Sequence, residues 1–424
     1  MASTFTVLLY PYTVNMQGQL YTGDKFPHAV LHDPRREDRF ILEPSLEIGL
    51  SKAGSMTFTV TEKNPFYKQM CLDLQWEVVV LRGSTFVWAG FPVIMERDLY
   101  GNATFTCEGV LSYLNLVHIP PFRYENVSPS TLFYDVVFRK YISEIKPDSG
   151  ESDKRINSRY RHRNFAGGSY NGFDVSETRY ETKLEDGETH WYTKTEERKI
   201  TRYSKKTLSA MEVLQTRLVD YFGGNLYVGM NPDPESSGAL WNINYTPDDE
   251  ENRCRQTIEE GKNILELNLT KDETDFCTAV VPTNESGDAC FDASNSGSMS
   301  ISDGKGNVLA VRRPYSNVFR NVSLVKKYGI ITNTCDTTEG AGTEQIVGET
   351  LLKAASLRAP HVTYDVKAID LSLVDGGSDW MKPGKYVHVI SKKRDLDSWL
   401  IVDRLSLRLD DPTNNRVELG GTIS

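Results

Sequence analysis

Alternating apolar and polar residues dominate the first part of the chain. In SMTFTVTEK, the side chains of Met56, Phe58 and Val60 are separated by Ser and Thr, and ATFTCEG repeats this spacing. A period of two is typical of a strand with one buried face. Short strands separated by Gly, Pro and Asn turns continue until the pattern changes at a Pro-Pro pair. The pattern predicts a first β domain over residues 1–118.

The closing residues repeat the outline of an earlier segment. WEVVVLRGSTFVWAGFPVIMERDLYGNATFTCEG places two apolar strands around a short loop and a third strand after a Gly-Asn turn. KYVHVIS and DSWLIVDRLSLRLDDPTNNRVELGG follow the same order with low identity. We interpret this as one β unit used twice. The second β domain is predicted over residues 298–424, with one helix at about 343–357.

Helical signals occupy the region between the two β domains, predicted as 119–261. Ser128 and Pro129 provide a capping hydroxyl and a proline at the first helical position, which predicts a helix to about Ile145. A second helix is predicted at about 209–222, where Ser209 and Glu212 have the spacing of a capping box. We expect these two helices to pack together.

A charged insert at about 148–206 contains few Leu, Ile or Val residues. Within it, Asp186-Gly187 lies between two runs of Thr and aromatic residues, which predicts a solvated β-hairpin. Beyond the helices, Ile264, Leu267 and Leu269 are spaced as on a strand. We expect residues 262–297 to return as strands to the first β domain. The fold class is therefore mainly β (α+β), with two β-barrel or sandwich domains and an intervening helix-and-hairpin region.

Bulk composition limits the class of protein. The chain has 424 residues, 39% of them hydrophobic, and a formal net charge of −10. That length favours about three domains. The acidic balance argues against a protein that mainly grips nucleic acid or an anionic membrane. The N-terminus lacks a basic region followed by an apolar run, and no stretch approaches ~20 apolar residues, so we expect cytoplasmic synthesis and no membrane insertion.

Candidate chemistry is sparse. The six cysteines form no CxxC pair and are predicted to be reduced. The sequence contains no phosphate-binding Gly loop, dinucleotide fingerprint, HExxH or nucleophile elbow. His388 alternates with apolar residues, so a satisfied strand histidine is favoured over a catalytic base. The acidic runs 248–251 and 410–411 lack the spacing of a calcium loop and are interpreted as solvated turns. No catalytic, cofactor or metal residues are predicted.

A basic cluster lies inside the charged insert. Its members are Arg155, Arg159, Arg161 and Arg163, interleaved with Tyr160 and His162. In outline this is a nucleic-acid or glycan patch. A solvated loop or an inter-subunit contact is the favoured interpretation.

Taken in order, several segments resemble the tail-hub proteins of long-tailed bacteriophages and prophages, a family described as prophage minor structural protein or prophage endopeptidase tail. These segments are AGSMTFTVTEKNPF, WAGFPVIMERD with FTCEGVLSYLN, TLSAMEVLQTRLVDYFGGNLYV, GKNILELNLTKDETDFCTAVVP with KYGIIT, and TYDVKAIDLS through DDPTNNRVELG. They cover most of the chain. The main departure from the family is the charged stretch 150–201.

The resemblance implies a homotrimer at the distal tail tip of a virion. Each subunit of such a hub contributes two tail-tube-like β domains, so that three subunits form a pseudo-sixfold ring below the distal tail protein. The implied partners are that protein, the tape-measure protein and tail-tip or fibre proteins, with DNA only in transit. The net charge of −10 adds the hypothesis of an acidic lumen that repels phosphates. Asp365, Asp370, Asp410 and Asp411 are the candidates to face it.

Two other functions remain open. Related hubs include endopeptidases and peptidoglycan hydrolases, but the last predicted strand ends near Ser424, so we expect no fused lysin. A glycan-binding adhesin would explain the aromatic content and the β architecture. An adhesin should bind cell walls as an isolated protein, whereas a hub should trimerise and bind tail partners.

Overall fold

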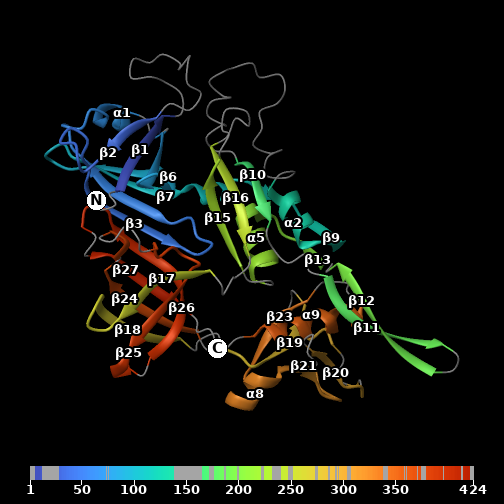
Figure 1. The fold of residues 1–424 in the computed structure, drawn as a ribbon. Helices are drawn as coiled ribbons and strands as arrows, with labels where there is room; N and C mark the ends of the chain where they lie inside the picture. The colour runs from blue at the N-terminus through green and yellow to red at the C-terminus, as the bar shows by residue number, and fades with distance from the viewer. Residues whose placement is uncertain are drawn as a thin grey trace, which may run out of the picture.

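A computed structural model defines the architecture (Figure 1). The described residues are 5–11, 28–72, 74, 76–137, 165–170, 176–185, 188–197, 200–220, 224–231, 240–246, 252–272, 276–284, 287–291, 294, 296–302, 307–337, 342–357, 359, 361–369, 371–373, 379–394, 396–411 and 414–420.

One sheet of 13 strands connects the two ends of the chain. Its N-terminal β unit, blue in Figure 1, comprises β1 (Phe5–Pro11), β2 (Ala29–His32), β3 (Leu42–Gly49), β4 (Ser55–Val60), β5 (Trp76–Arg82), β6 (Thr85–Arg97) and β7 (Ala103–Gly109), with helix α1 (Tyr67–Leu72). Its C-terminal β unit comprises β17 (Arg253–Glu259), β18 (Ile264–Asp272), β24 (His361–Ala368), β25 (Tyr386–Ser391), β26 (Leu396–Arg408) and β27 (Arg416–Gly420), with the short turns η4 (Leu371–Leu373) and η5 (Lys392–Arg394). The mainly β fold predicted from the sequence is confirmed.

The two β units share one strand plan, as the repeated outline in the sequence predicts. In each, a long strand pairs through its first half with the preceding strand and through its second half with the following one: β6 with β5 and β7, β26 with β25 and β27. Both long strands carry a register shift at the same place, between Pro92 and Ile94 in β6 and between Val402 and Arg404 in β26. The coincident shift aligns the units residue by residue.

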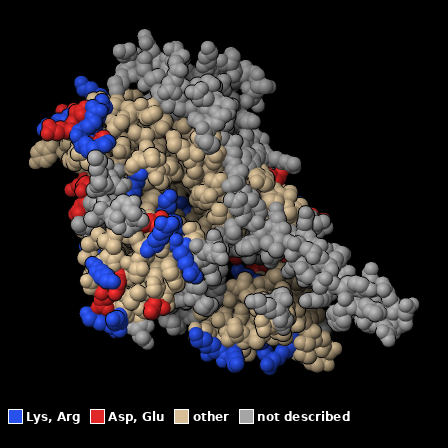
Figure 2. Space-filling model, viewed as in Figure 1, with Lys and Arg blue, Asp and Glu red and all other residues tan. Residues whose placement is uncertain are grey.

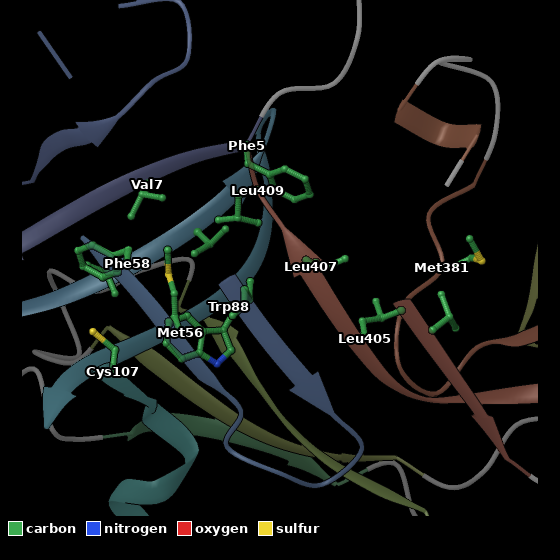
Figure 3. Close-up of a cluster of buried hydrophobic side chains, with 14 of the residues drawn as sticks. Phe5, Val7, Met56, Phe58, Trp88, Cys107, Met381, Leu405, Leu407 and Leu409 are labelled. Atoms are coloured by element: carbon green, nitrogen blue, oxygen red, sulfur yellow. The ribbon is translucent and has the colours of Figure 1, made fainter. Parts of the chain in front are cut away.

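A single hydrophobic core runs through both β units. Met56, Phe58 and Cys107 of the N-terminal unit belong to the same buried cluster as Leu405 and Leu407 of the C-terminal unit (Figure 3). The alternating positions noted in the sequence face this core because successive strand residues point to opposite sides of the sheet. The two units are therefore halves of one packed body.

The middle unit covers the outer side of β5 and β6. It contains η1 (Val110–Asn115), β8 (His118–Ile119), β9 (Phe122–Val127), α2 (Pro129–Tyr134), β10 (Phe165–Tyr170), β13 (Ile200–Ser204), β14 (Leu208–Ser209), α5 (Ala210–Leu214), η3 (Gln215–Val219), β15 (Asn225–Met230) and β16 (Trp241–Thr246). The two predicted helix starts are confirmed, since the Ser128 and Ser209 side chains accept hydrogen bonds from the amides of Thr131 and Glu212. Both helices contribute to one buried cluster; the predicted end of the first lies outside the described residues.

The predicted hairpin is also confirmed. β11 (Ser176–Glu185) pairs antiparallel with β12 (Glu188–Glu197), with Glu185 opposite Glu188 on either side of the predicted turn. The Asp-Gly signal was sufficient because a two-residue loop fixes the register of the strands around it.

An inserted unit separates β18 from β24. Its elements are β19 (Ala279–Thr283), β20 (Met299–Ser302), β21 (Val308–Arg312), β22 (Phe319–Asn321), α8 (Val322–Tyr328), β23 (Thr332–Asp336) and α9 (Thr343–Ser356). These strands form their own five-stranded sheet, and α9 confirms the helix predicted at 343–357. Arg312, fully buried, is held by the carbonyls of Ser316 and Gly297 at 2.6 and 2.7 Å. This unit has its own core.

The predicted partners of two segments are wrong. The strand containing Leu267 and Leu269 was expected to return to the first β domain, but β18 pairs with β24 of the C-terminal unit. Residues 298–424 were expected to form one domain, but the strands before α9 join the separate five-stranded sheet. Strand periodicity reports which face is buried and carries no information about which distant strand lies alongside. We therefore propose a C-terminal domain made of 252–272 and 361–420, interrupted by the inserted unit.

Candidate functional site

The junction between the two β units is a continuous strand pairing. β26 runs antiparallel to β3, with Leu407 opposite Leu46 and Arg404 opposite Gly49. The pairing extends past the strand ends, because the Leu50 amide donates to the carbonyl of Asp403 at 2.9 Å and the Leu409 amide to that of Pro44 at 3.0 Å. On the core side, Leu46 and Leu407 are buried. Strand edges that would otherwise be open are thus satisfied within the chain.

The opposite face of this junction is polar and of mixed charge. Arg404 Nη1 donates to Glu418 Oε1 at 3.3 Å, and Glu47 stands opposite Ser406. Further along the same face, the Thr59 and Thr104 hydroxyls lie 2.8 Å apart. Glutamate, arginine, serine and threonine therefore share the surface. Such a face favours contact with water or with a polar solute.

The predicted lumen residues fall at several places. Asp365 stands opposite Glu418 in the β24–β27 pairing, while Asp370 lies outside the described residues. Asp410 approaches Arg408 Nε at 3.6 Å, and Asp411 accepts a hydrogen bond from Asn414 Nδ2 at 2.5 Å in the turn between β26 and β27. The three described candidates therefore do not come together at one place.

A cavity of about 640 Å³ opens where the N-terminal, middle and C-terminal units meet. Its lining includes Trp88, Met230, Trp380 and Lys382. Trp88 Nε1 donates to the Ala53 carbonyl at 2.9 Å, and Lys382 Nζ lies 5.1 Å from the Trp380 ring centre. Burial lowers the pKa of Lys382. Basic and acidic side chains are interspersed on the face of the molecule that Figure 2 shows. The walls come from three units, so the shape of the cavity depends on how these units are placed relative to one another.

A buried carboxylate anchors the middle unit to the N-terminal unit. Glu77, on β5, has no exposed surface. It accepts hydrogen bonds from the Tyr113 hydroxyl and, at 3.3 Å, from Trp241 Nε1. A buried acceptor without these donors would lose its hydration with no hydrogen bond to compensate, which would destabilise the fold. The three groups therefore specify how the two units dock.

His388 has structural partners, as the sequence favoured. Its Nε2 lies 2.7 Å from Asp397 Oδ1, and its ring stacks on Trp399 with the centroids 5.0 Å apart. Arg253 covers the same indole at 4.7 Å. The histidine is thus held in a four-residue cluster on the outer face of β25 and β26.

The candidate metal ligands and the arginine cluster can be located only in part. Within the described residues, no group of three His, Cys, Asp or Glu side chains is placed to hold a metal ion. The six cysteines form no disulfide with one another in the structure. The acidic run 248–251 and the arginine cluster 155–163 lie outside the described residues. Among the described helices, none is long and apolar enough to cross a membrane.

The fold, with its paired β units, is similar to that of solved phage tail proteins. The tail protein of Neisseria meningitidis MC58 superposes with a TM-score of 0.53 at 11% identity, covering 99% of this chain and 97% of that one. Prophage tail protein gp18 of Listeria monocytogenes EGD-e gives 0.51 at 12%, covering 98% and 94%. The 43 kDa tail protein of prophage MuSo2 from Shewanella oneidensis gives 0.51 at 10%, covering 99% and 98%.

A family model matches the C-terminal part of the chain, which is less than half of its length. Residues 252–423 match the family model described as prophage endopeptidase tail. Together with the shared fold, this match confirms the resemblance to prophage tail proteins predicted from the sequence. Among curated proteins, none matches the chain.

Sequence reasoning missed three features of the site: the β26–β3 junction, the cavity and the buried Glu77. The Lys382-Pro383-Gly384 turn was recognised, but its place in the cavity wall depends on units distant in sequence. A single glutamate within the apolar run WEVVVL was the one available signal for the buried carboxylate.

Proposed function

We propose that the protein is a structural hub of a phage tail, forming a ring of three chains at the distal end of the tail tube. The observation that carries this proposal is the edge-to-edge pairing of β26 with β3, which places two β units of like plan side by side in one sheet. Three such chains supply six like units. That number fits the pseudo-sixfold ring implied by the resemblance.

The ring would join the tube to the tip and line the channel through which tape-measure protein and DNA pass. Its neighbours would be the distal tail protein above and tip or fibre proteins below. The polar face around Arg404, Glu418 and Glu47 suits a channel wall because its charged groups can stay hydrated beside a passing chain. Mixed charge there replaces the uniformly acidic lumen as the favoured form of the channel hypothesis.

We assign no enzymatic role. The histidine at position 388 is engaged by Asp397 and Trp399, and the described residues offer no metal cluster. The family description names an endopeptidase, so peptidoglycan hydrolysis is an outcome to be tested along with wall binding.

The experiment is reconstitution with tail tubes. The purified chain is mixed with tubes lacking a tip and imaged by negative stain. A hub caps one end of each tube as a ring with a central hole. Binding to cell walls, with no capping of tubes, would favour the adhesin, and release of peptidoglycan fragments would favour the hydrolase.

A further inference from the structure

The β26–β3 junction joins two strand edges, and each of them has a counterpart in the other β unit. Among the described strands, neither counterpart has a partner at that edge. The second half of β6 corresponds to the second half of β26, since both follow the same register shift. β26 carries β3 beside that half. Among the described strands, β6 pairs with β5 and β7 alone, so the equivalent side of residues 93–97 is open.

β18 is the counterpart of β3. It pairs with β24 as β3 pairs with β4, and β24 in turn pairs with β27 as β4 pairs with β7. Within this alignment Leu269 occupies the place of Leu46. They stand opposite Tyr364 and Met56, whose partners Leu419 and Cys107 pair with the residues just before the two register shifts. β18 ends the sheet order in the described residues.

Side chains at the free edges are more exposed than the equivalent side chains at the joined edges. Leu46, covered by β26, is 0% exposed, whereas Leu269 is 51% exposed although it points toward the core side. Leu409, at the end of the joined strand, is 6% exposed, and its equivalent Leu99 is 96% exposed. At these two pairs of equivalent positions, a leucine that is buried at the joined edge is exposed at the free edge.

We propose that the second half of β6 pairs antiparallel with β18 of a second copy of this chain, in the register of the β26–β3 junction. This places Arg97 opposite Leu269 and Glu96 opposite Thr270 of the partner copy. The inference rests on the proposed ring and names the surface that closes it. Each copy has one free β6 edge and one free β18 edge. The contact is therefore head-to-tail, and its repetition from copy to copy can close a ring.

The hydrogen-bonding pattern agrees with this register. The Asp98 amide donates to the Asn102 carbonyl on the β7 side, so the alternate residues Met95, Arg97 and Leu99 direct their backbone groups to the open side. At the joined edge, the equivalent Leu409 amide donates to Pro44. Glu96 and Thr270 then form a non-hydrogen-bonded pair, in which Cα atoms approach to about 4.5 Å.

That separation suits a disulfide, which supplies the test. The full chain carrying Glu96→Cys and Thr270→Cys is oxidised and analysed on a non-reducing gel, alongside imaging of the unmodified chain. Glu47→Cys with Ser406→Cys, the equivalent pair at the joined edge, is the matched control and cross-links within one chain. Glu96→Cys with Asn268→Cys, displaced by two residues, tests the register, and single variants account for the natural thiols.

The expected result is a ladder of covalent products that ends at the number of chains in the ring, with about tenfold less from the displaced pair. If rings form and the control pair cross-links but Glu96→Cys with Thr270→Cys does not, this interface is wrong and the ring proposal stands. Cross-linked open filaments would support the interface and contradict the ring. Monomers without cross-links would overturn both.

Discussion

The two β units follow one strand plan but meet different neighbours on their outer face. In the N-terminal unit, Val79 and Ala89 are buried in the core shared with the middle unit. The equivalent positions in the C-terminal unit are His388 and Trp399, which stack on a half-buried face. The residues that face the shared core are apolar in both units. The residues on the outer face differ in character according to what packs against them.

The joined and free edges give a second contrast. The same strand geometry buries Leu46 in one place and leaves Leu269 half exposed in the other. Inside the chain, the junction contributes to folding. At its ends, the equivalent edges contribute only when copies meet, so assembly and stability should respond to different residues.

The largest effect is expected for Leu46→Ala compared with Leu269→Ala. Removing the buried leucine should lower the free energy of unfolding by about 3 kcal/mol, because it leaves a cavity at the junction. The half-exposed leucine should cost less than about 1 kcal/mol in the monomer. Urea unfolding at a concentration without assembly measures both. Equal losses would contradict the assignment of joined and free edges.

Replacing Glu77 should sharpen the contrast on the outer face. Glu77→Leu deprives the Tyr113 hydroxyl and Trp241 Nε1 of their shared acceptor, and should cost about 2 kcal/mol. Glu77→Gln retains an acceptor and should cost less. Thermal unfolding of both variants checks this order, which a harmless Glu77→Leu would contradict.

Stability should fall in acid because of two groups at the edge of the N-terminal unit. Burial lowers the pKa of His32 below its usual 6.5, against opposing effects of Asp33 and Asp410. The unfolded chain then binds the proton more readily, so stability present above pH 6.5 is lost as the pH falls, by at most about 1.4 kcal/mol per pH unit. His32→Phe should flatten the decline in Tm between pH 7 and 5.

Asp33 acts at lower pH. A hydrogen bond from the Arg35 guanidinium lowers the Asp33 pKa to about 2, so its contribution is complete above 3.8 and is lost as the pH falls through 2. Asp33→Asn should remove the decline in that window and leave the one near pH 6 in place. If the loss of stability at low pH is unchanged in this variant, other carboxylates cause that loss.

The smallest effect is expected on the open face of the C-terminal unit. Trp399→Ala removes the stack on His388 and the contact of Arg253, worth about 1 kcal/mol at a half-exposed site. The mass of the assembled protein should not change. A loss of assembly in this variant would show that a partner covers this face.

Much of the local structure was predictable because its causes are local. Ser128 and Ser209 act on backbone groups a few residues away, and the Asp-Gly signal concerns only the strands next to it in sequence. The helix starts and the strand pairing predicted from them are confirmed. Alternating residues such as Met56 and Phe58 likewise identified buried faces.

What the sequence did not provide is the partner of each strand. β18 has the same periodicity whether it pairs with β24 or with a strand of the first unit, and the inserted sheet between them leaves no mark on that pattern. The β26–β3 junction follows from the same long-range pairing. It joins strands from the two ends of the chain, and the local sequence pattern of neither strand specifies the other as its partner.

In the proposed ring, one chain supplies two of six like positions. Light scattering of the purified chain across a concentration series measures the mass of the assembly. We expect a species of three chains that appears as concentration rises and persists on dilution of the oxidised Glu96→Cys with Thr270→Cys variant. A monomer at every concentration, or a closed assembly whose number of chains is not three, would contradict the proposed ring.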